Sequence, residues 1–164
     1  MDPMKGRHVF ASDIREHMGF DRWNSAFKFA FVRNPWARLV SWYHSCLKEP
    51  LSRNEFHRYI QANTSCFEEF LNTTAGLALK TTVNQIDYVA DSAGRPIVDF
   101  IGRFERLQQD FQFIGTRLQL PLTLPHSNKG LAVADYRSFY NDETRDLVAR
   151  RFQRDIEIFR YTFD

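Results

Sequence analysis

A strand that leads directly into a helix is predicted by the stretch Lys28-Phe29-Ala30-Phe31-Val32-Arg33-Asn34-Pro35-Trp36-Ala37-Arg38-Leu39-Val40-Ser41. The run Phe27 to Val32 is almost entirely apolar, which is typical of a strand buried on both faces of a parallel sheet. Pro35 sets the backbone angle of a first helical turn, and Asn34 can cap it. We expect the helix to continue to about Lys48.

The predicted helix has two different faces. At helical spacing, its apolar residues fall on one stripe and its polar residues on the other. The apolar stripe consists of Trp36, Leu39, Val40, Tyr43 and Leu47, and the polar stripe of Arg38, Ser41, Ser45 and Lys48. One face is therefore expected to pack, and the other is able to bind.

An anion site is the functional hypothesis for this junction. Arg33 lies at the carboxyl end of the strand and Ser41 on the second helical turn, so a guanidinium and a hydroxyl can meet one anion. The positive end of the helix dipole would add to the attraction. The alternative is an ordinary strand-to-helix junction whose arginine pairs with a carboxylate.

The pattern of Arg33, Pro35, Arg38 and Ser41 behind an apolar strand resembles the 3'-phosphate-binding segment of the sulfotransferase superfamily. In that family, the arginine and the serine hold the 3'-phosphate of 3'-phosphoadenosine 5'-phosphosulfate (PAPS), the sulfuryl donor. Three later segments resemble the carbohydrate branch of the family and follow its order: Val98 to Glu105, Leu124 to Gly130 and Asp155 to Tyr161. The resemblance covers most of Lys5 to Asp164.

This resemblance implies an α/β fold, with a small parallel sheet flanked by helices as in P-loop NTPases, in one partial domain over residues 1–164. It implies transfer of a sulfuryl group from PAPS to a carbohydrate hydroxyl, without a metal. Arg33 and Ser41 would bind the donor, Arg38 would support them, and Lys129 would add a contact. The partners are then the nucleotide donor and a carbohydrate acceptor, whose identity the sequence does not encode.

One part of the family pattern has no counterpart in the sequence. Family members normally begin with a strand, a loop bearing lysine and threonine or serine, and a helix, and that loop cradles the 5'-phosphosulfate. No G-x-x-x-x-G-K-[ST] motif occurs here. We therefore expect a shortened chain. The alternative function is that of a catalytically impaired homologue that binds only the 3'-phosphate nucleotide or a partner.

Histidines supply the candidates for the catalytic base. His8 is favoured because its placement upstream of the strand is similar to that of the base in the carbohydrate branch, although a surface histidine near a chain end is an equal alternative. His44, three residues after Ser41, could line the site, but a structural role is favoured for it. His126 lies in a loop whose composition suits a lid over a nucleotide. Lys129 and Arg137 are candidates for contacts to the 3'-phosphate or to an anionic glycan.

Arg103 is a further candidate, since it follows a second apolar strand, and open α/β sheets place ligands at such strand ends. An ion pair with Glu105 or Asp99 is its alternative role. Trp36 and Trp42 could stack on adenine or a sugar, but the position of Trp36 on the apolar stripe favours the core.

Composition limits the remaining function classes. The 164 residues include 16 Phe, three Trp and six Tyr, which can supply one core. The formal charge of +2 is too small to suggest nucleic-acid binding. Cys46 and Cys66 form neither a disulfide framework nor a metal motif. There is no membrane span or signal peptide, so we expect a soluble chain, cytoplasmic if bacterial and in the Golgi lumen if part of an anchored enzyme.

Local patterns predict the other elements. They are a helix over Ser12 to Met18 capped by Ser12, a helix within Cys66 to Ala75, a hairpin around Asp91 to Gly94, a helix from Phe104 to about Leu118, and one long helix from about Asp142 to Phe159.

Overall fold

The computed structural model of the chain describes residues 9–48, 55–76, 83–124 and 135–164. These residues form two compact units. The described residues of the strand unit are 9–33 and 84–124, and those of the helical unit are 34–48, 55–76, 83 and 135–164.

The strand unit is built on two parallel strands, β1 (Phe29–Val32) and β2 (Phe100–Arg103). Phe29 pairs with Phe100, and Val32 pairs with Arg103, so the two strands end together. Gly102 is required by close packing, because a Cβ there would lie 2.5 Å from Cε1 of Phe31. The predicted strand is confirmed, although it begins at Phe29 rather than Phe27. Its predicted burial on both faces is wrong, because Phe29 is 43% exposed and only Val32 of the strand is buried.

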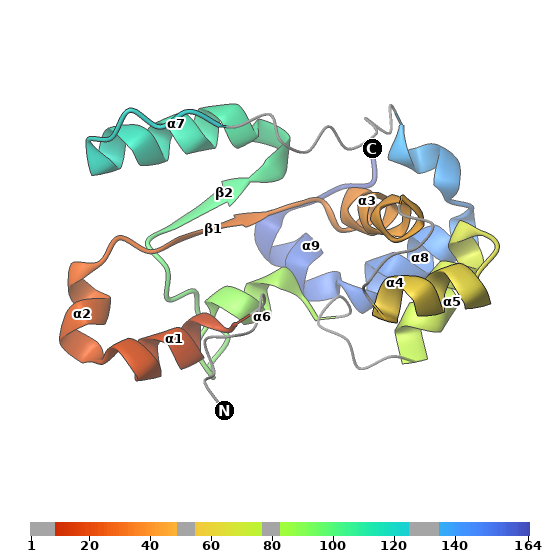
Figure 1. The fold of residues 1–164 in the computed structure, drawn as a ribbon, viewed down its shortest axis with the longest axis horizontal. Coiled ribbons are helices and arrows are strands. Elements are labelled where there is room, and N and C mark those ends of the chain that lie inside the picture. The colour runs from red at the N-terminus through yellow and green to blue at the C-terminus, as the bar shows by residue number, and fades with distance from the viewer. Residues whose placement is uncertain (1–8, 49–54, 77–82, 125–134) are drawn as a thin grey trace. The chain divides into compact units, whose positions relative to one another are not determined.

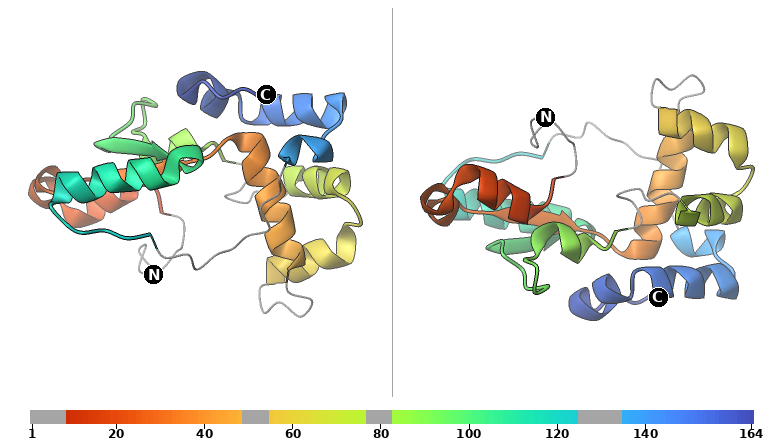
Figure 2. Two further views of the ribbon diagram at one scale, coloured as in Figure 1. Left: turned by 90° about the horizontal axis from the view of Figure 1, so that it is seen from above. Right: turned by 90° about the horizontal axis from the view of Figure 1, so that it is seen from below.

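Helices lie on both sides of the strand pair. They are α1 (Ala11–Met18), α2 (Phe20–Ser25), α6 (Gln85–Val89) and α7 (Leu107–Leu118), which follows a 3₁₀ turn at Phe104–Arg106. Helix α7 covers one face of the strands, and α1 and α6 lie toward the other (Figures 1 and 2). The prediction of an α/β fold with a small parallel sheet flanked by helices is confirmed.

The helical unit surrounds α3 (Pro35–Leu47). Its other elements are α4 (Glu55–Asn63), α5 (Phe67–Gly76), a 3₁₀ turn at Tyr136–Phe139, α8 (Asp142–Arg151) and α9 (Gln153–Phe159). Helix α3 contacts α4, α5, α8 and the turn. Leu39, Val40, Ile60, Phe70, Leu71, Val148 and Phe152 form the fully buried part of this core. Leu47 is exposed at the end of α3, so its predicted place on the packing stripe is wrong.

Three predicted elements differ from the observed ones. The long terminal helix is divided at Phe152, whose backbone leaves the helical region (φ −115°, ψ 31°) while its side chain is fully buried. Ser12 lies inside α1, which begins at Ala11 without a side-chain cap. The turn at Asp91 forms, and Ala90 pairs with Pro96, but the residues before it are helical, so the hairpin is reduced to one bridge.

No helix in the described part of the chain is both long enough and apolar enough to cross a membrane.

Candidate functional site

Arg33 follows the last residue of β1, and its backbone is held by a side chain distant in sequence. The amide of Gln85, at the start of α6, accepts a hydrogen bond from Arg33 N–H at 2.9 Å and donates one to the Arg33 carbonyl at 2.8 Å. These two bonds satisfy both backbone polar groups of Arg33 where the ladder with β2 ends. The backbone position of Arg33 is therefore fixed.

The guanidinium of Arg33 lies over an aromatic ring. Its Cζ is 4.2 Å from the centroid of Phe104, the first residue after β2. Burial lowers the pKa of the guanidinium below its usual value, and the negative charge of Glu105 partly offsets this. Among the residues that the structure describes, no side chain or carbonyl accepts a hydrogen bond from this guanidinium. A half-buried cation in this state gains by taking an anionic partner.

The start of α3 confirms the predicted cap. Asn34 Oδ1 accepts hydrogen bonds from the N–H groups of Trp36 at 3.0 Å and Ala37 at 3.3 Å, and Arg38 N–H donates to the Asn34 carbonyl at 2.8 Å. Because Pro35 has no N–H, the donors of the first turn are all used. The helix can thus attract an anion through its dipole, but direct contacts must come from side chains.

Asn34 also ties the C-terminal residues to α3. Its Nδ2 donates to the Thr162 carbonyl at 2.8 Å, and the ring of Phe163 packs edge-on against Trp36, with centroids 5.5 Å apart. Asn34 is itself buried. One side chain therefore stabilises both the helix start and the end of the chain.

Ser41 and Arg38 lie one turn apart on α3, and both are half-buried. The guanidinium of Arg38 lies 4.7 Å above the ring of Phe152, and Nη2 donates to the Val83 carbonyl at 3.4 Å. The Ser41 hydroxyl has no hydrogen bond to another described residue. Arg33 belongs to the strand unit and Ser41 to the helical unit.

Arg103 is the last residue of β2, beside Val32, whereas the sequence predicted that it would follow a strand ending at Ile101. Its N–H donates to Asp110 Oδ2 at 2.6 Å, so a buried carboxylate lies next to this strand end. Asp99, one of the two carboxylates considered as its partner, pairs with Lys28 Nζ at 2.9 Å.

The other candidates take part in packing or surface pairing, or are not described. Trp36 is buried and donates from Nε1 to the Arg145 carbonyl at 3.0 Å, which confirms its core role. Trp42 stacks on Phe56 at 4.9 Å. The ring of His44 lies against Phe139, and Arg137 pairs with Asp135. His8, His126 and Lys129 lie outside the described residues.

Sequence patterns did not indicate Gln85 or Phe104. Gln85 lies in a stretch without clear periodicity, 52 residues from Arg33, and no local signal identifies it. Phe104 follows Arg103, and the register that brings Arg103 beside Val32 is seen only in the structure.

The described residues contain no cluster of three or more His, Cys, Asp or Glu side chains suited to a metal ion. A family model described as "Sulfotransferase family" matches residues 1–162. Comparisons with curated proteins and with solved structures find no match. Because the family match spans nearly the whole length of the sequence, the chain belongs to the sulfotransferase family.

Proposed function

We propose that this protein transfers a sulfuryl group from PAPS to a carbohydrate hydroxyl. Membership of the sulfotransferase family supports a sulfotransferase-like function. The choice of PAPS rests on the pattern from Arg33 to Ser41, and the choice of a carbohydrate rests on the resemblance of the later segments to the carbohydrate branch.

The single observation that carries the proposal is the state of Arg33. Gln85 fixes its backbone, Phe104 supports its guanidinium, and no described acceptor neutralises it. It lies at the carboxyl end of a parallel strand, where α/β sheets usually bind ligands. A planar, half-buried guanidinium suits two oxygens of a phosphate.

In the proposed reaction, a base removes the proton of the acceptor hydroxyl, whose oxygen attacks the sulfur of PAPS. The bond from sulfur to the bridging phosphate oxygen breaks, and 3'-phosphoadenosine 5'-phosphate (PAP) leaves. Arg33 and Ser41 hold the 3'-phosphate, Arg38 supports that site, and Lys129 adds a contact. His8 is the base. The roles of His8 and Lys129 rest on their positions in the sequence.

A transfer assay tests the proposal. The full chain is incubated with radiolabelled PAPS and a panel of oligosaccharides, and labelled glycan and released PAP are measured. Replacing His8 by Ala should lower kcat about 100-fold, which is within the usual contribution of a general base, and leave PAP affinity unchanged. His17→Ala, at an exposed position of α1, is the matched control and should keep full activity.

Failure of the wild-type protein to label any glycan while it binds PAP would overturn the transferase proposal. The protein would then be a nucleotide-binding homologue.

A further inference from the structure

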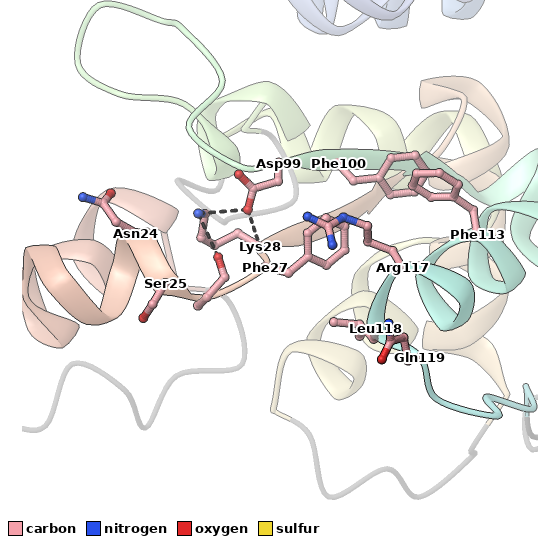
Figure 3. Close-up of a pocket in the computed structure, with 11 residues that line it drawn as sticks. Asn24, Ser25, Phe27, Lys28, Asp99, Phe100, Phe113, Arg117, Leu118 and Gln119 are labelled. Atoms are coloured by element: carbon pink, nitrogen blue, oxygen red, sulfur yellow. Dashed lines mark hydrogen bonds and ion pairs between the residues drawn. The ribbon is translucent and has the colours of Figure 1, made fainter.

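A pocket of about 740 Å³ lies at the amino ends of β1 and β2. It is bounded by the end of α2, the start of each strand and the second half of α7 (Figure 3). Its volume lies within the range of about 300–1,000 Å³ that is usual for ligand sites. Arg33 lies at the opposite, carboxyl end of β1, so the pocket is separate from the proposed nucleotide site.

Phenylalanine rings form one wall of this pocket. The rings of Phe100 and Phe113 lie together, with centroids 4.7 Å apart, and Phe27 lies beside them (Figure 3). Phe113 is 51% exposed, so part of its ring is open to solvent. A flat aromatic surface open to solvent can take the apolar face of a sugar ring.

The charges of the pocket are unequal. Lys28 Nζ donates to Asp99 Oδ2 at 2.9 Å and to the carbonyls of Trp23 and Ala26, so its three donors are used. Arg117 extends from α7 across the ring of Phe27, with Cζ 5.5 Å from the centroid (Figure 3). In the described part of the chain, nothing accepts a hydrogen bond from its guanidinium. The lining therefore has one positive charge in excess, and Arg117 can offer it to a ligand.

Uncharged polar side chains complete the lining. Asn24 and Ser25 lie at the α2 end, and Gln119 lies next to Arg117 at the end of α7. The Ser25 hydroxyl donates to the Arg22 carbonyl at 3.1 Å and can still accept a hydrogen bond, and side-chain amides both donate and accept, as a ligand rich in hydroxyls requires. The backbone of Gln119 is held by the α7 cap, in which its N–H donates to the carbonyls of Gly115 and Thr116.

We propose that this pocket binds an acidic oligosaccharide, with a sugar ring on Phe113 and a carboxylate or sulfate group on Arg117. The acidic character follows from the excess positive charge of the lining. The carbohydrate character rests on the proposed function. An oligosaccharide bound at the amino ends of the strands would be anchored away from the reacting hydroxyl. This second contact would select acidic polymers as acceptors.

Calorimetric titration of the full chain tests this. A hyaluronan hexasaccharide, which carries uronate groups, should bind at least tenfold more tightly than neutral chitohexaose. Arg117→Ala should abolish that preference, since a hydrogen bond to a charged group is worth about tenfold or more in affinity. Arg150→Ala removes the same charge from an exposed site on α8 and should leave binding unchanged.

The phenylalanine wall of the pocket is tested with a second variant and its control. Phe113→Ala should weaken hyaluronan binding about fivefold to tenfold. Phe20→Ala removes a more exposed ring, 75% exposed, from outside the pocket and should have no effect. In wild-type protein, hyaluronan should shift the NMR signals of Phe113, Arg117 and Gln119, a readout that does not depend on the folding of a variant.

The proposal is overturned if hyaluronan does not bind, if its NMR shifts map outside the pocket, or if Arg150→Ala weakens binding as much as Arg117→Ala. It is also overturned if a hexaglutamate peptide binds as tightly as hyaluronan, because the pocket would then be a general anion site. PAP titration is scored separately. Loss of PAP binding with hyaluronan binding intact would refute the nucleotide proposal and leave this one standing.

Discussion

The two parallel strands end side by side in arginine-bearing junctions that differ in charge. After β1, the amide of Gln85 satisfies the backbone of Arg33, and no charge is added. After β2, the carboxylate of Asp110 accepts the N–H of Arg103 at 2.6 Å and lies 3.7 Å from Arg106 Nη2. The Gln85 amide that holds the first junction is neutral, and among the described residues only the charge of Glu105 acts on Arg33, whereas at the second junction a buried carboxylate is hydrogen-bonded directly to the strand end.

This difference indicates which junction can serve as the phosphate site. Both arginines follow apolar strands, so their sequence context is similar. Asp110, which is only 8% exposed, places a carboxylate next to the β2 end that already pairs with Arg106 and would oppose a phosphate on Arg103. We therefore expect anion binding at Arg33 and not at Arg103.

The largest expected effect comes from removing each arginine in turn. Arg33→Ala should weaken PAP binding about 100-fold, because a charge-assisted pair with phosphate is lost from a half-buried position. Arg103→Ala should change the affinity less than about threefold. Calorimetry with PAP measures both, and equal losses in the two variants would contradict the comparison.

The cap after β1 should have the next largest effect, on stability. Asn34→Ala should lower the free energy of unfolding by about 2 kcal/mol, because the N–H groups of Trp36 and Ala37 and the Thr162 carbonyl lose their partner. Urea denaturation measures this. Asn34→Asp keeps the cap acceptor but places a carboxylate oxygen against the Thr162 carbonyl at a buried position, so it should also destabilise the protein. An Asn34→Ala variant as stable as wild type would show that the cap is not needed.

A smaller effect is expected from removing the Gln85 amide, which holds the backbone of Arg33. Gln85→Ala should weaken PAP binding about fivefold. The backbone of Arg33 is no longer held in this variant, so ordering that backbone on binding costs part of the binding free energy. Asp110→Ala, at the other junction, should lower stability without weakening PAP binding. If Gln85→Ala binds PAP as tightly as wild type at a temperature where both are folded, Gln85 does not position Arg33.

The smallest expected effect is on the pH dependence of stability, and it comes from the pair of Lys28 and Asp99 at the amino ends of the strands. Two hydrogen bonds from Lys28 hold the pKa of Asp99 below its usual value. The larger contribution comes from the backbone N–H and the smaller from the ammonium group. A lowered pKa adds stability above the unfolded value of about 3.9, and that stability is lost as the pH falls through the folded value.

Asp99→Asn should therefore lose less stability than wild type when the pH is lowered below about 4. The difference should be small, because the side chain is 42% exposed and solvent screens the pair. Thermal unfolding between pH 7 and pH 3 measures it, with Asp13→Asn on α1 as the control. Parallel pH curves for Asp99→Asn and wild type would contradict a role for this pair.

Local signals were enough to predict the β1 to α3 junction. Pro35 and Asn34 mark a helix start within the sequence itself, and the structure confirms both positions. The break at Phe152 could not be predicted, because the apolar spacing continues through it and only the backbone angles change. The clamp by Gln85 depends on the packing of α6 near β1, a contact between distant segments that leaves no periodic trace. The roles of Arg33, His8, Ser41, Arg38 and Lys129 stay predictions.

The most direct measurement compares PAP with adenosine 5'-phosphate, which lacks the 3'-phosphate, on wild type and Arg33→Ala. If Arg33 recognises that phosphate, wild type should prefer PAP by about 100-fold, and the preference should vanish in Arg33→Ala while the affinity for adenosine 5'-phosphate stays the same. A preference for PAP that persists in the variant, or is missing from wild type, would contradict the assignment of Arg33 to the 3'-phosphate.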